Sequence, residues 1–343
     1  MRELPAEPIF QRSALRARGW SDPAIHRALV AGRLVRIRHG WLAANADDAA
    51  RKVAIAAARA NVGAVLSHRS AAVMHALPIV GTRALVPELT VQPRGPGTIT
   101  GAHVHRATMY ADDILLIDGV PVTSVARTLI DLGRHRTTAC AVAAIDHALH
   151  NELVTMVELE EILVRCWNWP RIRRAQRAVR FADARAESPL ESISRLALRW
   201  LRLPPPEPQV IAIDQRGYPA GRFDFYWDEY GVGGESDGKA KYLDDPEEHD
   251  KEKQRQEYLE DHRVVFARWG WDEPWRHPQL LKSKVLNAFE RGRARDRSGL
   301  ARLWSVRPSE IKADGTRSGF PPRCSVSRPL TEHLGGKPDQ DGR

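Results

Sequence analysis

The stretch that decides the fold of the C-terminal half is Arg222-Phe-Asp-Phe-Tyr-Trp227, followed closely by Gly231-Val-Gly-Gly-Glu-Ser-Asp-Gly238. Asp224 and Glu235 are equidistant from the centre of the turn between them, so an antiparallel hairpin places them opposite each other. Asp237 shares their side because strand side chains alternate. Three acids on one face repel one another unless a cation lies among them, and carboxylate oxygens suit Mg²⁺. The hairpin therefore predicts a Mg²⁺ (or Mn²⁺) site.

This cluster has the chemistry that phosphodiester hydrolysis needs, because a carboxylate-held Mg²⁺ positions water and neutralises charge at the phosphate. Asp224 and Glu235 are the predicted metal ligands, and Asp237 is a third ligand or orients a metal-bound water. Lys241, just past the strand, would orient the nucleophile or stabilise developing charge. The alternative without a metal is a salt-bridge cluster, in which the same register makes Arg222 face Asp237.

Two more residues near the hairpin have two interpretations each. Glu191 could reach the metal from the preceding helix as a catalytic residue, but Ser188-x-x-Glu191 is also a capping-box pattern, which implies no catalysis. Arg255 lies on a charged segment, Pro246 to Asp261, that we predict to be helical. It either holds DNA or belongs to a solvated face.

The elements of residues 186–293 are predicted in the order αβββαβα, an α/β domain whose restriction-endonuclease-like core is implied by the resemblance described below. The order comprises a helix from Ser188, a strand at 209–213, the hairpin, the charged helix, a strand at 264–269 and a helix at 278–291. The tail, 294–343, is rich in Arg, Ser, Gly, Pro and Asp without periodicity, and we predict that it is disordered.

Residues 1–45 are predicted to form a winged helix-turn-helix. A short helix from Arg12 is closed by Gly19. A second helix begins at Ser21-Asp22-Pro23, where a capping residue precedes a proline in the first turn. An alternating basic ribbon then turns at His39-Gly40.

Four residues of this unit are predicted to bind DNA. His26 and Arg27 would lie on the recognition helix and reach base edges. Arg36 and Arg38, on one phase of the ribbon, would contact phosphates from the wing. The alternative is a small helical domain that contacts proteins.

Residues 46–185 are predicted to be a mixed α/β middle region, mostly helical, with short strands between 85 and 125. Arg165 to Arg185 holds seven Arg and one Asp. This composition fits a phosphate-facing helix and a solvated linker helix equally well.

Two histidine pairs in the middle region, His68 with His75 and His103 with His105, raise the question of a metal site. No carboxylate or cysteine lies beside them at a ligand spacing. The sequence therefore gives no support to metal binding there.

Composition favours a nucleic-acid partner, because the chain of 343 residues has a net charge of +9 that is carried mainly by arginine. Arginine richness is also typical of proteins from GC-rich genomes. Cys140, Cys166 and Cys324 are scattered without a Cys-x-x-Cys pair, which argues against a disulfide framework or a zinc ribbon. We find no apolar run of membrane-spanning length and no signal-peptide pattern, so we expect no membrane partner and a cytoplasmic location.

The C-terminal domain resembles the very-short-patch-repair-endonuclease-like branch of the PD-(D/E)XK nuclease superfamily. The resemblance lies in Arg222-Phe-Asp-Phe225, Glu235-x-Asp-Gly-x-x-Lys241, Glu187-Ser-Pro-Leu-Glu191, Glu252-Lys-Gln-Arg255 and the strand ending at Trp269. It implies an endonuclease-like fold with Asp224 and Glu235 in the metal-ligand places. The superfamily's lysine two residues after the acid is here Asp237, and Gly233-Gly234 replaces the usual bulky apolar residues.

The N-terminal half resembles the AbiEi-type antitoxins of type IV toxin–antitoxin systems. The matching pieces are the winged-helix segment, Ser67-His-Arg-Ser-Ala-Ala72, His105-Arg106 and Thr123-Ser-Val-Ala-Arg-Thr-Leu-Ile-Asp131. The resemblance implies promoter binding, repression of the protein's own operon and a cognate toxin partner. Two functions are therefore predicted: a Mg²⁺-dependent DNA endonuclease in defence or repair, and an antitoxin-like transcriptional regulator whose nuclease fold is inactive.

Overall fold

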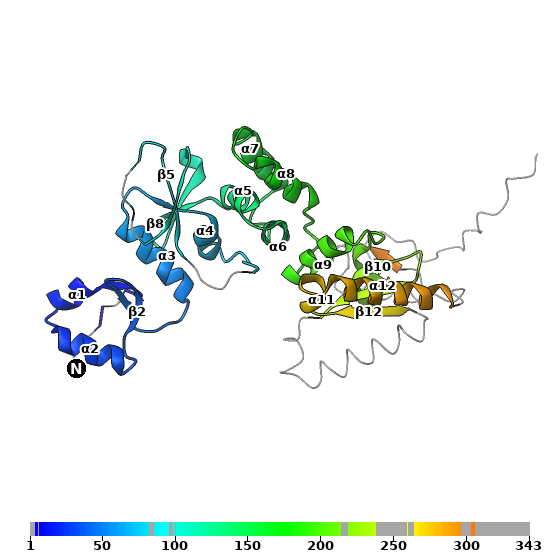
Figure 1. Cartoon of the computed structure of the whole chain (residues 1–343), viewed down its shortest axis with the longest axis horizontal. Helices are drawn as coiled ribbons and strands as arrows, with labels where there is room; N and C mark the ends of the chain where they lie inside the picture. The colour runs from blue at the N-terminus through cyan, green and yellow to red at the C-terminus, as the bar shows by residue number, and fades with distance from the viewer. Residues whose placement is uncertain are drawn as a thin grey trace, which may run out of the picture.

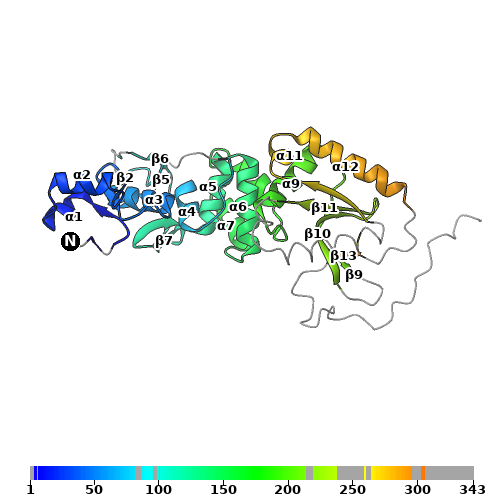
Figure 2. The same cartoon turned by 90° about the horizontal axis from the view of Figure 1, so that it is seen from below.

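The structure is a computed structural model that describes residues 4–5, 7–81, 86–95, 99, 101–213, 219–237, 259, 264–295 and 303–305. Three β-sheets divide the chain into α/β units that follow one another in a row (Figures 1 and 2). Within the described part, no helix has both the length and the apolar character needed to cross a membrane. The predicted multi-domain α/β class is confirmed.

The N-terminal unit has a three-stranded sheet of order β1-β3-β2. Its elements are β1 (Phe10–Gln11), α1 (Arg12–Ala17), α2 (Asp22–Val30), β2 (Val35–Arg38) and β3 (Trp41–Ala43). Ser21 caps α2 by accepting a hydrogen bond from the backbone N–H of Ala24. Leu15 of α1 and Ile25 of α2 are buried in the same core. The helix, turn, helix and ribbon occur in the predicted order, and the winged-helix assignment stays a prediction.

The ribbon departs from strict alternation at Ile37, because the register of β2 on β3 shifts between Arg36 and Arg38. Arg36 is exposed and Arg38 is half-buried. A Cβ atom on Gly101, in the middle region, would lie 2.7 Å from Nη2 of Arg38. The prediction that Arg36 and Arg38 share one solvent-facing phase of the ribbon is therefore corrected: Arg38 packs against the middle region.

The middle region contains a five-stranded sheet of order β6-β5-β4-β8-β7, with α3 (Ala49–Ala60) and α4 (His68–Met74) beside it. The strands are β4 (Val65–Leu66), β5 (Glu88–Val91), β6 (His103–Arg106), β7 (Ile114–Ile117) and β8 (Val120–Thr123), and the short helix η1 (Ala111–Asp113) precedes β7. The sequence predicted β5, β6 and β8 but neither β4 nor β7. Ala54 and Ile55 of α3 share a buried core with Leu66 and Leu89 of the sheet.

Four helices complete the middle region: α5 (Val125–His135), α6 (Thr138–His150), α7 (Met156–Arg165) and α8 (Ile172–Phe181). Ser124 and Thr137 cap α5 and α6 with their hydroxyl oxygens. The guanidinium of Arg127 is buried under the helices, where Nη1 lies 3.0 Å from Oδ2 of Asp113 and Nε lies 2.9 Å from Oδ2 of Asp131. This ionic group ties α5 to the loop before β7.

The C-terminal domain contains a five-stranded sheet of order β12-β11-β10-β9-β13. Its elements are α9 (Pro189–Trp200), β9 (Glu207–Ile213), β10 (Pro219–Trp227), β11 (Val232–Ser236), β12 (Val265–Trp269), α11 (Asp272–Trp275), α12 (Pro278–Arg293) and β13 (Leu303–Ser305). Among the described strands of this sheet, β11 and β12 pair in parallel and the other pairs are antiparallel. Side chains of α9 and α12 share a core with β10, β11 and β12.

The predicted elements of this domain are found where the structure describes them, and its assignment to the endonuclease fold stays a prediction. The charged helix predicted at 246–261 lies outside the described residues except for Leu259. The tail predicted to be disordered contributes β13, which pairs with β9 through Leu303, Trp304 and Ser305. That part of the prediction is corrected, because three residues of suitable register complete the sheet.

The predicted boundary between residues 185 and 186 lies beside a packed junction. Ile193 and Leu196 of α9 pack on Ala139 of α6. Nη1 of Arg195 lies 2.9 Å from Oδ2 of Asp146. Burial outweighs the attraction of Arg195 and raises the pKa of Asp146 to about 6. The C-terminal domain is therefore anchored on the helices of the middle region.

Candidate functional site

The hairpin turns where the sequence predicts. Strands β10 and β11 are antiparallel, and the pair Trp227–Val232 centres the turn between residues 229 and 230. Continuing the register one residue beyond the pair Phe225–Gly234 brings Asp224 opposite Glu235. The two acids are therefore neighbours across the strands.

Strand alternation is broken at Asp224. A Cβ atom on Gly233 would lie 2.5 Å from the ring of Phe223, and one on Gly234 would lie 3.1 Å from Cβ of Phe225. Gly233 and Gly234 are successive residues of β11 and therefore face opposite sides of the sheet. Phe223 lies on the side of Gly233 and Phe225 on the side of Gly234, although the two phenylalanines are two residues apart and should share a side. The prediction that alternation puts the three acids on one face is therefore wrong at Asp224.

Protein groups already bind both acids. Oδ2 of Asp224 accepts hydrogen bonds from the backbone N–H of Ser236 at 2.8 Å and from its hydroxyl at 2.7 Å. Oε2 of Glu235 accepts one from Nε of Arg268 at 2.6 Å. The arginine comes from the parallel neighbour β12, where it is the register partner of Glu235. Arg268 therefore neutralises much of the negative charge of Glu235.

Glu191 makes the capping contacts with Ser188 that the sequence predicts, and its role at a metal stays a prediction. Its Oε1 accepts a hydrogen bond from the Ser188 hydroxyl at 2.8 Å, and Ser188 caps α9 by accepting from the backbone N–H of Glu191 at 3.2 Å. Its Oε2 accepts from Nε2 of Gln209, also at 2.8 Å. Burial, and after it the negative charge of Asp224, raises the pKa of Glu191. The capping residue therefore also interacts with Asp224.

The other predicted hairpin residues are placed differently. Arg222 forms an ion pair with Glu187, just before α9, at 2.6 Å. Asp237 is half-buried, and its backbone N–H donates to the carbonyl of Trp269. Lys241 and Arg255 lie outside the described residues. Among the described residues, no three acidic side chains form a group that could hold one metal ion.

The N-terminal unit presents positive charge to solvent. His26 and Arg27 are exposed on α2, and Arg36 is exposed on β2. Arg16 of α1 is also exposed, but it forms an ion pair with Asp22. Neither Arg27 nor Arg36 has an ion-pair partner among the described residues, so both are available to an external anion.

Helix α8 carries a second arginine surface. Arg173, Arg177 and Arg180 are exposed at spacings of four and three residues, which places them on one side of the helix. Arg174 turns inward, and its Nη2 donates to the backbone carbonyl of Arg136 at 2.9 Å. The opposite side of α8 is buried in the helical core. Helix α8 is therefore a packed element with an arginine face, and not a free linker.

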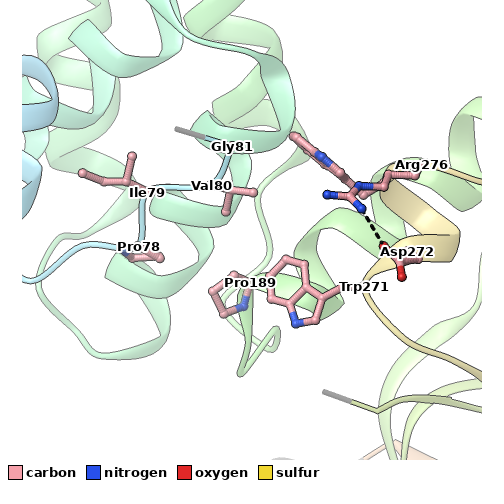
Figure 3. A pocket seen from close by; sticks show the side chains of 9 residues that line it. Pro78, Ile79, Val80, Gly81, Pro189, Trp271, Asp272 and Arg276 are labelled. Carbon is pink, nitrogen blue, oxygen red and sulfur yellow. Dashed lines mark ion pairs between the residues drawn. The ribbon is translucent and has the colours of Figure 1, made fainter. Parts of the chain in front are cut away.

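A cavity of about 450 Å³ lies at the junction of the middle region and the C-terminal domain (Figure 3). The α4–β5 connection forms one wall and the start of α9 with α11 the other; the lining residues are Pro78, Ile79, Val80, Gly81, Pro189, Trp271, Asp272, Trp275 and Arg276. Its charged pair, Asp272 and Arg276, lies 3.5 Å apart at the surface. None of the sequence-predicted site residues lines this cavity.

Three histidines that the sequence does not group together meet in the middle region. His68, His105 and His135 offer ligand atoms that all lie within 4.8 Å of one another, and we call them the histidine cluster. The sequence argument relied on the absence of a nearby carboxylate, but Oε2 of Glu88 lies 3.0 Å from Nε2 of His105. Sequence spacing could not show this, because sheet pairing and the end of α5 bring the residues together.

Comparisons with known proteins support the antitoxin-like half of the chain. Residues 66–181 match the AbiEi antitoxin C-terminal domain family. Two uncharacterized proteins of Mycobacterium tuberculosis, Rv2248 of strain ATCC 25618 / H37Rv and MT2308 of strain CDC 1551 / Oshkosh, are each 26% identical over 265 residues, covering 76% of this chain and 94% of theirs.

Among solved structures, the crystal structure of RV2827C protein from Mycobacterium tuberculosis matches with a TM-score of 0.35 and 18% identity, covering 51% of this chain and 72% of that chain. These comparisons give no support to the endonuclease resemblance.

Proposed function

We propose that this protein is an antitoxin-like transcriptional regulator of the type IV toxin–antitoxin class, which binds DNA through its N-terminal unit. The match of residues 66–181 to the AbiEi antitoxin C-terminal domain carries this proposal. The resemblance of the N-terminal half to antitoxins that repress their own operons points the same way. The proposal assigns residues 1–45 to the promoter and the middle region to the antitoxin role.

The N-terminal unit supports the proposed DNA contact. Arg27 and Arg36 are exposed without a partner among the described residues, so phosphates could bind them without first breaking an ion pair. His26 lies beside Arg27 on the second helix of the helix-turn-helix, the position from which such helices read base edges. Arg38 was predicted to contact phosphates as well, but it is half-buried beside Gly101 of the middle region, so the proposal relies on Arg27 and Arg36.

The direct test is binding to the DNA upstream of the protein's own gene. We expect a duplex of that sequence to bind more tightly than a scrambled duplex of equal length at physiological salt. A reporter fused to the same upstream region should be repressed by the wild-type protein. Equal binding to both duplexes together with no repression would reject the regulator.

The antitoxin role needs a second measurement. If a neighbouring gene encodes a growth-inhibiting protein, co-expression of this chain should restore growth. A chain lacking residues 1–45 should retain the antitoxin role if the middle region suffices, while losing DNA binding. Growth inhibition that this chain never relieves would leave only the DNA-binding part of the proposal.

Mg²⁺-dependent DNA cleavage is the second candidate function. The observation that favours it is the buried carboxyl of Glu191, whose pKa is raised next to Asp224, since perturbed carboxyl groups often mark active sites. Carboxylate oxygens of Asp224 and Glu191 suit Mg²⁺, which would supply a positioned water and charge neutralisation. Glu235 is less suitable as a metal ligand, because its carboxylate accepts a hydrogen bond from Arg268.

A plasmid-nicking assay with Mg²⁺ or Mn²⁺ tests this second function. Asp224→Asn and Glu191→Gln should abolish nicking. Glu229→Gln, a matched change of an exposed acid in the turn, should leave it intact. Equal nicking by all four proteins would assign the activity to a contaminant and remove the nuclease hypothesis.

A further inference from the structure

The histidine cluster is assembled from three separate segments of the middle region. His68 is the first residue of α4, His105 lies on β6, and His135 is the last residue of α5. Nε2 of His68 lies 3.2 Å from Nδ1 of His135. The rings of His68 and His105 are stacked, with centroids 3.5 Å apart. Such convergence requires the complete fold of the middle region.

Two rings of the cluster have one nitrogen beside an oxygen acceptor. Nδ1 of His68 lies 3.0 Å from Oγ of Ser67, and Nε2 of His105 lies 3.0 Å from Oε2 of Glu88. The third ring turns its Nδ1 toward His68, and this nitrogen of His135 lies 3.2 Å from both Nε2 of His68 and the carbonyl oxygen of Asp131. Metal-binding histidines typically donate their second N–H in this way, because it fixes the tautomer and directs the other lone pair to the metal.

The distance between two of the ring nitrogens also suits a metal. Two nitrogen ligands at 2.0–2.1 Å from a tetrahedral Zn²⁺ lie about 3.3 Å apart. The observed 3.2 Å between His68 and His135 matches this value. His105 completes the set, because the ligand atoms of all three histidines lie within 4.8 Å of one another.

The backbone conformation of His68 agrees with this role. His68 has a φ of 51°, a left-handed conformation that is uncommon outside glycine and concentrates at functional sites.

The charges around the cluster restrict which metals can bind. The carboxylate of Glu88 is buried, and it lies within hydrogen-bonding distance of Nε2 of His105 and Nε of Arg69. Arg69 and Arg136 both pair with this carboxylate. Their positive charge opposes a cation that is held by electrostatics alone, such as Mg²⁺. The same positive charge weakens binding less for a metal that forms strong bonds to imidazole nitrogen.

We propose that His68, His105 and His135 form a binding site for a late first-row divalent metal such as Zn²⁺, with Glu88 orienting His105. Three histidines leave a tetrahedral Zn²⁺ one ligand short, and a water molecule would supply the fourth. The site lies within the residues that match the antitoxin family but does not depend on DNA binding or on nuclease activity.

The test uses the full chain without a histidine tag, dialysed against Zn²⁺ together with a competing chelator that removes loosely bound metal. We expect one Zn²⁺ per chain in the wild-type protein and at least a tenfold weaker affinity in His105→Gln and His135→Gln. Zn²⁺ should raise the melting temperature of the wild-type protein and not that of either variant. Mg²⁺ in the same experiment should not displace Zn²⁺.

His103→Gln is the matched control, because His103 is an exposed neighbour on the same strand and lies outside the cluster. It should retain the wild-type stoichiometry. Circular dichroism and the melting temperature without metal establish that each variant is folded before its affinity is compared. The proposal is overturned if the wild-type protein retains no Zn²⁺, if the cluster variants bind it as tightly, or if His103→Gln loses it equally.

Discussion

Replacing both Arg27 and Arg36 with glutamine should lower the salt dependence of DNA binding by a calculable amount. Both side chains are exposed and have no ion-pair partner among the described residues. A phosphate contact adds about 0.9 to the slope of log affinity against log salt concentration, so two lost contacts lower it by about 1.8. Over a fourfold rise in salt, the wild-type protein should therefore lose about 12-fold more affinity than the double variant.

Fluorescence anisotropy of a labelled duplex, titrated from about 50 to 200 mM salt, measures both slopes. Arg16→Gln is the matched control, because it removes the same charge from the same unit but from an arginine already paired with Asp22. Its slope should stay near that of the wild-type protein. Equal slopes for the wild-type protein and the double variant would show that α2 and β2 do not touch the phosphates. An equal decrease in Arg16→Gln would point to diffuse attraction.

Three further predictions concern stability. Arg127→Ala should lower the free energy of unfolding by about 3–5 kcal/mol, because it leaves Asp113 and Asp131 buried with one cation fewer; urea denaturation giving a loss below about 1 kcal/mol would contradict this. Gly233→Ala should cost about 1–3 kcal/mol, because its Cβ would meet an aromatic ring at 2.5 Å, and an unchanged melting temperature would refute the overpacking. The pKa of Asp146 is about 6 in the folded state, above its value in the unfolded state. Its protonation therefore contributes fully to the free energy of unfolding below about pH 4, and this contribution is lost as the pH rises to about 6. Relative to Asp146→Asn, the free energy of unfolding of the wild-type protein should fall by about 3 kcal/mol as the pH rises through that range. A difference between the two proteins that does not change with pH would refute the raised pKa.

Local patterns predicted much of the fold. The cap and proline at Ser21-Asp22-Pro23 located α2, and the equal spacing of Asp224 and Glu235 about the turn located the register of β10 on β11. These features depend on hydrogen bonds between residues close in sequence. Strands β4 and β13 were missed because strands of two or three residues have too few alternating positions to be recognised.

The arrangement of side chains at the candidate sites could not be predicted in the same way. Alternation failed at Asp224 because Phe223 and Phe225 pack on opposite sides of the sheet. It also failed at Arg38, where the register shifts by one residue. The meeting of His105 with His135 depends on how α5 packs beside the sheet, which residue spacing does not encode.

The late position of β13 in the chain affects how the protein folds during synthesis. One core of the N-terminal unit is formed by residues between Phe10 and Leu42, so this core can fold soon after it leaves the ribosome. Strand β9 must instead wait for Leu303–Ser305 before its outer edge is covered. A nascent chain would thus have a folded N-terminal core while its last sheet still exposed an unpaired edge, the kind of surface that recruits chaperones or associates with another chain.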